Sequence, residues 1–129
     1  MEFWFEQTDP DQWFEKDPTF DANIRERFLG LHEILASRGN NGLLADAQTS
    51  LAAVIVLDQM SRNMFRDTPR AFATDPQALQ VAEMAGVKHL AITHHDPDHD
   101  DVFLRRMEQL CQERFRPCVL ARDGMELEI

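Results

Sequence analysis

The sequence is poor in cysteine and in long apolar runs, and both shortages limit what the protein can be. It has two cysteines, Cys111 and Cys118, and no C-x-x-C pair, so a disulfide framework and a cysteine-based metal site are excluded. No apolar run approaches the roughly 18 residues that a membrane helix needs. The N-terminal segment MEFWFEQTDP lacks the basic stretch of a secretion signal. We therefore expect a cytoplasmic protein in a reducing compartment.

Basic residues are also scarce. The chain of 129 residues has 13 lysines and arginines against 23 aspartates and glutamates, which gives a net charge of −10. No basic stripe is present to neutralise phosphates, so nucleic acid and anionic membranes are poor partners. Apolar residues make up 43% of the chain, enough to build a core. The sequence identifies no protein partner.

Three helices are expected in the N-terminal part. The stretch PTFDANIRERFLGLHEILASRG (18–39) places large apolar residues at helical spacing on one face. These residues are Phe20, Ile24, Phe28, Leu31 and Leu35. A second helix is expected at about 45–65, where LAAVIVL predicts a buried central helix. A third should begin at Asp75–Pro76, run to about residue 85 and end at Gly86.

The pattern changes after Gly86. VKHLAIT (87–93) and CVLAR (118–122) are typical of strands, and Asp123–Gly124 followed by MELEI predicts a hairpin into a third strand. An apolar stripe between them predicts a helix, with Phe103, Met107, Leu110 and Cys111 on one face. The fold class is thus α+β: a three-helix N-terminal part (1–86) followed by a β-α-β-β segment (87–129), which could pack as one domain.

Polar residues cluster where the second helix ends, within LDQMSRNMFRDTPRAFATDP (57–76). The acid-before-base order of Asp58 and Arg62, four residues apart, predicts an ion pair on one helix. One interpretation is a cleft that binds an anion or another small ligand. The other is a structural network that ties the following loop to the helix. The candidate ligand-binding residues are Asp58, Gln59, Arg62, Asn63, Arg66 and Arg70.

The same region carries a resemblance. FWF (3–5), WFEKDPTFDANIRERF (13–28) and LDQMSRNMFRDTPRAFATDP together resemble a bacterial domain-of-unknown-function family, number 924, over about residues 2–80. The resemblance implies an all-helical, tetratricopeptide-like fold. It implies no activity.

Histidines and aspartates crowd into ITHHDPDHDD (92–101), which has two interpretations. Imidazole and carboxylate groups bind Zn²⁺ or Mn²⁺, and the candidate ligands are His94, His95, Asp96 and His99. However, a catalytic metal needs ligands that converge from several elements, and this loop supplies them from one place. In the alternative, Asp98, Asp100 and Asp101 form the acidic start of a helix.

Residues 80–129 carry a second resemblance. AGVKHLAITHHDPDHDDVFLRRMEQLCQERF and CVLARDGMELEI are similar to the C-terminal end of metallo-β-lactamase-fold hydrolases, which implies that His94 is a metal ligand. That fold's principal H-x-H-x-D-H motif is absent. Two partial resemblances that meet near 76–86 suggest a recombinant, designed or rearranged chain.

Together these patterns favour a small acidic protein without catalytic function, at most a helical protein-interaction module that needs no cofactor. A metal-dependent hydrolase with an incomplete site is the alternative. Because uncovered strand edges and apolar faces drive association, we expect a homo-oligomer.

Overall fold

The computed structural model describes residues 1–13, 15–37, 46–93, 100–116, 118–122 and 124–126. The chain forms two compact units, Met1–Ala85 and Gly86–Ile129. The described residues are mainly helical, with one small two-stranded parallel sheet. No helix among them is long and apolar enough to cross a membrane.

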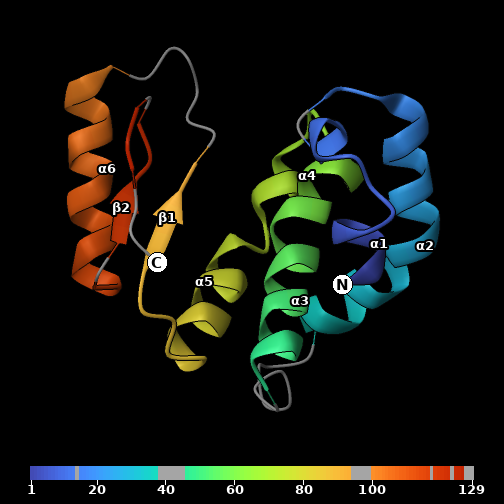
Figure 1. Ribbon diagram of the computed structural model, residues 1–129, viewed down its shortest axis with the longest axis horizontal. Helices are drawn as coiled ribbons and strands as arrows, with labels where there is room; N and C mark the ends of the chain where they lie inside the picture. Colours follow the sequence, from blue (N-terminus) through green and yellow to red (C-terminus); the bar gives the residue numbers. More distant parts are fainter. Residues whose placement is uncertain (14, 38–45, 94–99, 117, 123, 127–129) are drawn as a thin grey trace. The chain divides into compact units, whose positions relative to one another are not determined.

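The first unit is entirely helical in its described part and has more helices than the three expected (Figure 1). Its elements are α1 (Glu2–Phe5), η1 (Pro10–Trp13), α2 (Pro18–Ser37), α3 (Ala47–Leu57), α4 (Gln59–Met64), η2 (Pro69–Phe72) and α5 (Asp75–Met84). The short α1 lies between α2 and α3 in Figure 1. The additional elements are single turns, too short to leave a periodic apolar pattern in the sequence.

The predicted α2 is present, and most of its predicted apolar face is buried. Phe20, Ile24 and Leu35 are buried as expected, whereas Leu31 is 44% exposed. His32 is buried instead, with 3% exposure. By helical geometry Leu31 lies between Phe20 and Ile24 around the axis of α2, so the sequence pattern groups it with them correctly. Its exposure depends on which neighbouring helices cover this part of α2, and the pattern of a single helix does not reveal that.

The second predicted helix is split at Asp58. The helix α3 begins with Asp46 as N-cap, whose carboxylate accepts a hydrogen bond from the Thr49 amide at 2.8 Å. Hydrogen bonds from the Thr49 amide and hydroxyl favour the charged carboxylate and so lower the pKa of Asp46. At Asp58 the backbone leaves ideal helical geometry, with φ −107° and ψ −73°, and α4 then begins. The polar residues of α4 consequently point in directions that one straight helix would not give them.

Apolar side chains from α1 to α5 form one core in this unit, centred on Ile24, Leu57 and Val81, which are fully buried. The apolar stretch of α3 supplies Ala53, Ile55, Val56 and Leu57 to it, as expected for a central helix. The helix α5 begins one residue earlier than expected, with Thr74 rather than Asp75 as N-cap and Pro76 in the first turn. Gly86 follows with φ +67°, the left-handed conformation that favours glycine after a helix.

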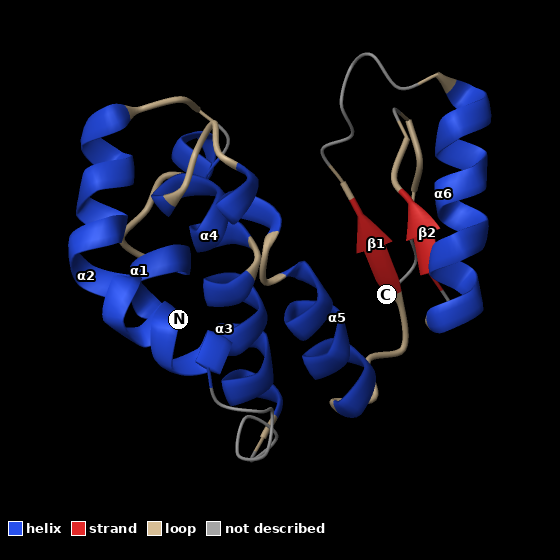
Figure 2. Cartoon of the chain, turned by 180° about the vertical axis from the view of Figure 1, so that it is seen from behind, coloured by secondary structure: helices blue, strands red, loops and turns tan. Residues whose placement is uncertain are grey.

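The second unit is a β-α-β arrangement (Figure 2). Strand β1 (Leu90–Ile92) pairs in parallel with β2 (Cys118–Leu120), and α6 (Asp101–Arg114) connects them. Parallel neighbours require such a crossover, because a tight turn can join only antiparallel strands. Asp100 caps α6 by accepting from the Phe103 amide at 2.8 Å. The acidic start of a helix, one of the two interpretations of this stretch, is therefore present at Asp100 and Asp101.

The predicted third strand is not seen in the described residues. Gly124 has φ +77° and the Met125 amide donates to the Arg122 carbonyl, so the predicted turn forms. Met125 and Glu126 are not in a strand, and residues 127–129 lie outside the described part. On α6, Met107 and Leu110 are exposed. The side of this helix toward β2 carries Glu108 instead, whose carboxylate accepts from the Leu120 amide at 3.0 Å.

Candidate functional site

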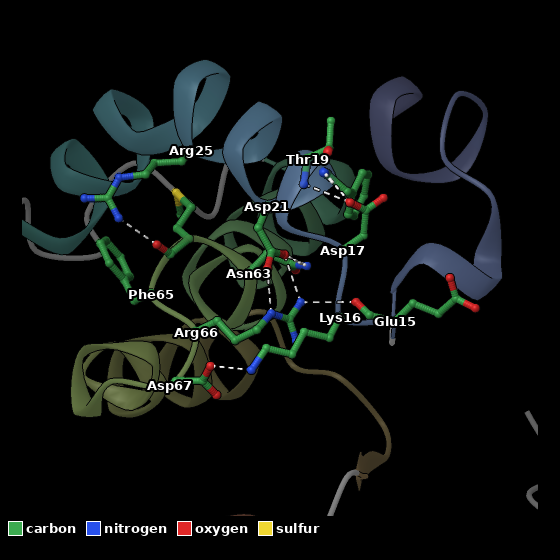
Figure 3. A network of polar contacts seen from close by, with 12 residues as sticks. Glu15, Lys16, Asp17, Thr19, Asp21, Arg25, Asn63, Phe65, Arg66 and Asp67 are labelled. Carbon is green, nitrogen blue, oxygen red and sulfur yellow. Dashed lines mark hydrogen bonds and ion pairs between the residues drawn. The ribbon is translucent and has the colours of Figure 1, made fainter.

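A two-pronged ion pair at the predicted cluster joins α2 to the chain just after α4 (Figure 3). Two nitrogens of Arg66 donate to the two carboxylate oxygens of Asp21, at 2.6 and 2.8 Å. Asn63 Nδ2 donates to the same carboxylate at 2.9 Å. This hydrogen bond from Arg66 to Asp21 is the main reason that the pKa of Arg66 is raised, against the opposing effect of burial. The carboxylate of Asp21 thus accepts both hydrogen bonds of the forked Arg66 guanidinium.

Weaker contacts surround this pair. Lys16 pairs with Asp67 at 2.5 Å, where both side chains are largely exposed, and Arg25 donates to the Met64 carbonyl at 2.8 Å (Figure 3). Asp67 has φ +61°, which only a minority of non-glycine residues adopt and which aspartate tolerates better than most. Together these contacts connect the chain after α4 to α2 and the segment before it.

Arg62 points to a different carboxylate. Its two terminal nitrogens donate to Asp75 at 2.7 and 2.9 Å, and it also forms the predicted ion pair with Asp58 at 2.9 Å. Burial lowers the pKa of Arg62, but the Asp75 hydrogen bond and the charge of Asp58 outweigh it, so the pKa is raised overall. Its Nη1 also donates to the Ala71 carbonyl at 2.8 Å. Gln59 contacts Asp58 through its amide nitrogen.

Arg70 lies elsewhere again. It pairs with Glu33 at 3.0 Å, with both side chains about half exposed, and its guanidinium lies 4.0 Å from the centre of the Phe65 ring. The three arginines proposed to face one anion therefore reach three different acids: Asp75, Asp21 and Glu33. Among the described residues, these contacts tie the loop after α4 to α2 and α5, which is the arrangement that the structural interpretation expects. Ligand binding by these residues stays a prediction from the sequence.

A buried polar cluster lies at His32, which the sequence showed only as an isolated histidine. The Thr74 hydroxyl donates to the Leu57 carbonyl at 2.5 Å, so its oxygen can accept from His32 Nε2 at 3.3 Å. The proton of the neutral ring is accordingly on Nε2, and the buried Nδ1 has no hydrogen-bond partner among the residues that the structure describes. Burial and the positive charge of Arg70 lower the pKa of His32. This histidine is thus a neutral component of the core.

An apolar groove, which the sequence did not predict, lies among the helices of this unit. It has a volume of about 90 Å³ and is formed by α1, α2, α3 and α4. We define the groove by the residues that line it, Met1, Phe3, Trp4, Phe28, Leu31, Ala52, Ile55, Val56 and Met60. The available signal was Phe3 and Trp4 in the sequence FWF at positions 3–5, because aromatic side chains contribute much of the apolar area at binding surfaces.

The helices that line the groove also expose large apolar side chains. These are Met1 and Phe5 on or beside α1, Leu31 and Ile34 on α2, and Leu51 on α3, each between 41 and 50% exposed. Arg27 lies over Phe3, with its guanidinium carbon 4.3 Å from the ring centre. The first unit therefore offers an apolar hollow with further apolar side chains on the same helices.

The candidate metal ligands His94, His95, Asp96 and His99 lie outside the described residues, as does Asp98. Within the described part of the chain, no group of three or more histidine, cysteine, aspartate or glutamate side chains is arranged to hold a metal ion. The described His89 is exposed. The fit of a metal to the loop therefore remains a prediction from the sequence.

The chain is similar to proteins of unknown function. The model of a family described as bacterial protein of unknown function, DUF924, matches residues 1–110. A solved structure, the protein of unknown function ATU0120 from Agrobacterium tumefaciens, is 41% identical, with a TM-score of 0.59. That match covers 64% of this chain and 47% of the other, so the chain spans about half the length of this relative. No curated protein matches.

These matches change the interpretation of the C-terminal part. The family match continues through the suggested junction at 76–86 and ends within α6. The resemblance to metallo-β-lactamase-fold hydrolases and the recombinant origin find no support in the comparisons, and neither does a hydrolase activity.

Proposed function

The chain belongs to the bacterial family of unknown function DUF924, and from this premise we propose that it is a helical interaction module that binds another polypeptide in the groove. This role needs no catalytic group. In it, the helices act like those of tetratricopeptide-like modules, whose packed helices present binding surfaces to partners.

One observation carries the proposal: the groove is lined by apolar side chains and lies beside others that are about half exposed. Leaving such side chains in water costs about 25 cal/mol per Å² of apolar surface, which a partner would recover by covering them. Grouped exposed apolar residues mark interaction sites more often than scattered ones do.

The shape of the groove favours a helical ligand. A hollow of about 90 Å³ can accept an anchoring side chain, while Leu31 and Ile34 extend the contact along α2. An amphipathic helix binds in this manner, with its anchors at positions i, i+3, i+4 and i+7. The ligand would supply a complementary apolar stripe.

The test uses a synthetic amphipathic peptide of about 18 residues, with leucine on one face and glutamine on the other, long enough to form a helix. Binding is followed through tryptophan fluorescence, because Trp4 lines the groove. Its ring stacks on that of Trp13, with 5.7 Å between the ring centres. The variant Leu31→Glu places a charge in the groove. Ala22→Glu is the matched control: Ala22 is exposed on the same helix, and nine residues rotate it about 180° from Leu31.

We expect saturable binding to the unmodified chain and to Ala22→Glu, and at least about a tenfold loss with Leu31→Glu, equivalent to about 1.4 kcal/mol. Circular dichroism of both variants verifies that they are folded. Binding that is equal in the two variants, or no binding to any form, would overturn the proposed function.

A further inference from the structure

We propose that the natural occupant of the groove is an amphipathic helix of another protein whose polar face carries lysine and arginine. This inference rests on the proposed function and specifies the chemistry of the partner. It is carried by the charge distribution of the unit that contains the groove.

The first unit has a large excess of negative charge. Residues 1–85 contain 14 acidic and 7 basic side chains, so the unit that forms the groove contributes most of the chain's net charge of −10. Two of these acids, Glu2 and Glu6, are exposed and lie within three residues of the groove-lining Phe3 and Trp4 in the sequence. Arg27 places one positive charge over the groove-lining Phe3 and Phe28, but the unit as a whole presents a negative field to an approaching partner.

Six of the seven basic residues of this unit lie in the described part of the chain, and all six side chains make contacts within the protein. Four of them form ion pairs: Lys16, Arg62, Arg66 and Arg70. Arg25 donates to a backbone carbonyl, and Arg27 lies over the rings of Phe3 and Phe28. The acidic side chains that have a basic partner have it within the protein. The remaining charge that faces solvent is negative. An acidic partner would find few available cations among these described side chains.

The same charge argues against other occupants of the groove. A second copy of the chain brings another −10, and the two copies repel each other most strongly at low ionic strength. An anionic lipid surface is repelled for the same reason. A basic helix gains both the apolar contact and the long-range attraction, which raises its association rate as well as its affinity.

The experiment compares three peptides with the same leucine face and with lysine, glutamine or glutamate on the polar face. Affinities are measured by tryptophan fluorescence at about 50 mM and 500 mM NaCl, across which the Debye length falls about threefold. We expect the lysine peptide to bind on the order of tenfold more tightly than the glutamine peptide at low salt. The glutamate peptide should bind least, and the lysine advantage should shrink at high salt.

The Leu31→Glu variant distinguishes binding in the groove from electrostatic attraction to the protein as a whole. This change adds a negative charge, so a purely electrostatic association with the lysine peptide would become stronger. If the leucine face of the peptide binds in the groove, Leu31→Glu should bind the lysine peptide more weakly. Ala22→Glu adds the same charge on the opposite side of α2 and should bind this peptide as the unmodified chain does.

Four outcomes would overturn the inference. Equal affinity for the lysine and glutamine peptides would leave the groove as a docking site but exclude a basic partner. Undiminished binding of the lysine peptide to Leu31→Glu would place the contact outside the groove. A dimer by light scattering that Leu31→Glu dissociates would identify a second copy as the occupant, as expected from the sequence alone. If no peptide binds, the proposed function fails as well.

Discussion

Arg66 and Asp21 form a two-pronged ion pair, with nitrogen–oxygen distances of 2.6 and 2.8 Å, that connects the chain after α4 to the first turn of α2. Both side chains are mostly buried, with 24% and 14% exposure. Charge-assisted hydrogen bonds in such surroundings contribute more than exposed ones, because water competes less for the charged groups.

We predict that Asp21→Asn destabilises the protein by about 2 kcal/mol, because it leaves the mostly buried Arg66 without its counter-charge. Urea unfolding measures the change. A double-mutant cycle with Arg66→Met should show a coupling of at least about 1 kcal/mol. The exposed pair of Lys16 and Asp67 is the control, and its coupling should be much smaller. Comparable couplings for the two pairs would contradict this prediction.

Protonation of His32 should make stability depend on pH. Its pKa is lowered below 6.5 in the folded state by burial and by Arg70, so the unfolded chain takes up the proton first. The contribution of His32 to the free energy of unfolding is therefore fully present above about pH 6.5, the pKa of histidine in the unfolded chain. It is lost as the pH falls from there through the lower pKa of the folded state. Urea midpoints at pH 7.5, 6.5 and 5.5 should therefore decline.

The variant His32→Gln removes the titrating group and should flatten this decline, although it costs stability at neutral pH through altered packing. His89→Gln is the matched control, since His89 is exposed. An equally steep decline in His32→Gln and in the unmodified chain would show that other groups cause the pH dependence.

Two glycines should respond in opposite ways to alanine. Neither Gly30 nor Gly86 has an atom within 4 Å of an added Cβ, but Gly86 has φ +67° whereas Gly30 is within α2. Gly30→Ala should stabilise the protein by about 0.5–1 kcal/mol, because alanine loses less backbone entropy in a helix. Gly86→Ala should destabilise by about 1 kcal/mol through strain. Thermal unfolding of both variants measures the two shifts, and shifts of the same sign would refute the argument.

The thiol of Cys118 should resist modification. Burial, followed by the proximity of Cys111, raises its pKa to about 11, so almost no thiolate is present at pH 8. In the Cys111→Ser variant, a thiol reagent at pH 8 should react slowly with the folded protein and rapidly after addition of urea. Rapid labelling of this variant in the folded state would mean that Cys118 is accessible.

Much of the fold could be predicted from the sequence because the signals are local. Phe20, Ile24 and Leu35 gave the buried face of α2, and the apolar run of α3 indicated its central place. The left-handed Gly86 marked the end of α5. Strands β1 and β2 were expected from short β-branched runs, but their parallel pairing was not, because pairing depends on residues far apart in the chain.

The contacts of the candidate site were also predictable only where the two residues are close in sequence. The pair of Asp58 and Arg62 could be predicted, because residues four apart on a helix are neighbours. The partners Asp21 for Arg66, Asp75 for Arg62 and Glu33 for Arg70 could not, because they are 13 to 45 residues away. The groove was missed for the same reason: its lining comes from four helices.

The sequence by itself determined the acidic charge, the helical periods, the caps and the lack of a basic surface, since each depends on composition or on residues within a turn of one another. Only the tertiary structure decided which carboxylate each arginine reaches, that His32 is buried while Leu31 is exposed, and that α1 to α4 leave an apolar hollow. These outcomes depend on how the helices pack, and packing is set by the combined shapes of side chains that are distant in sequence.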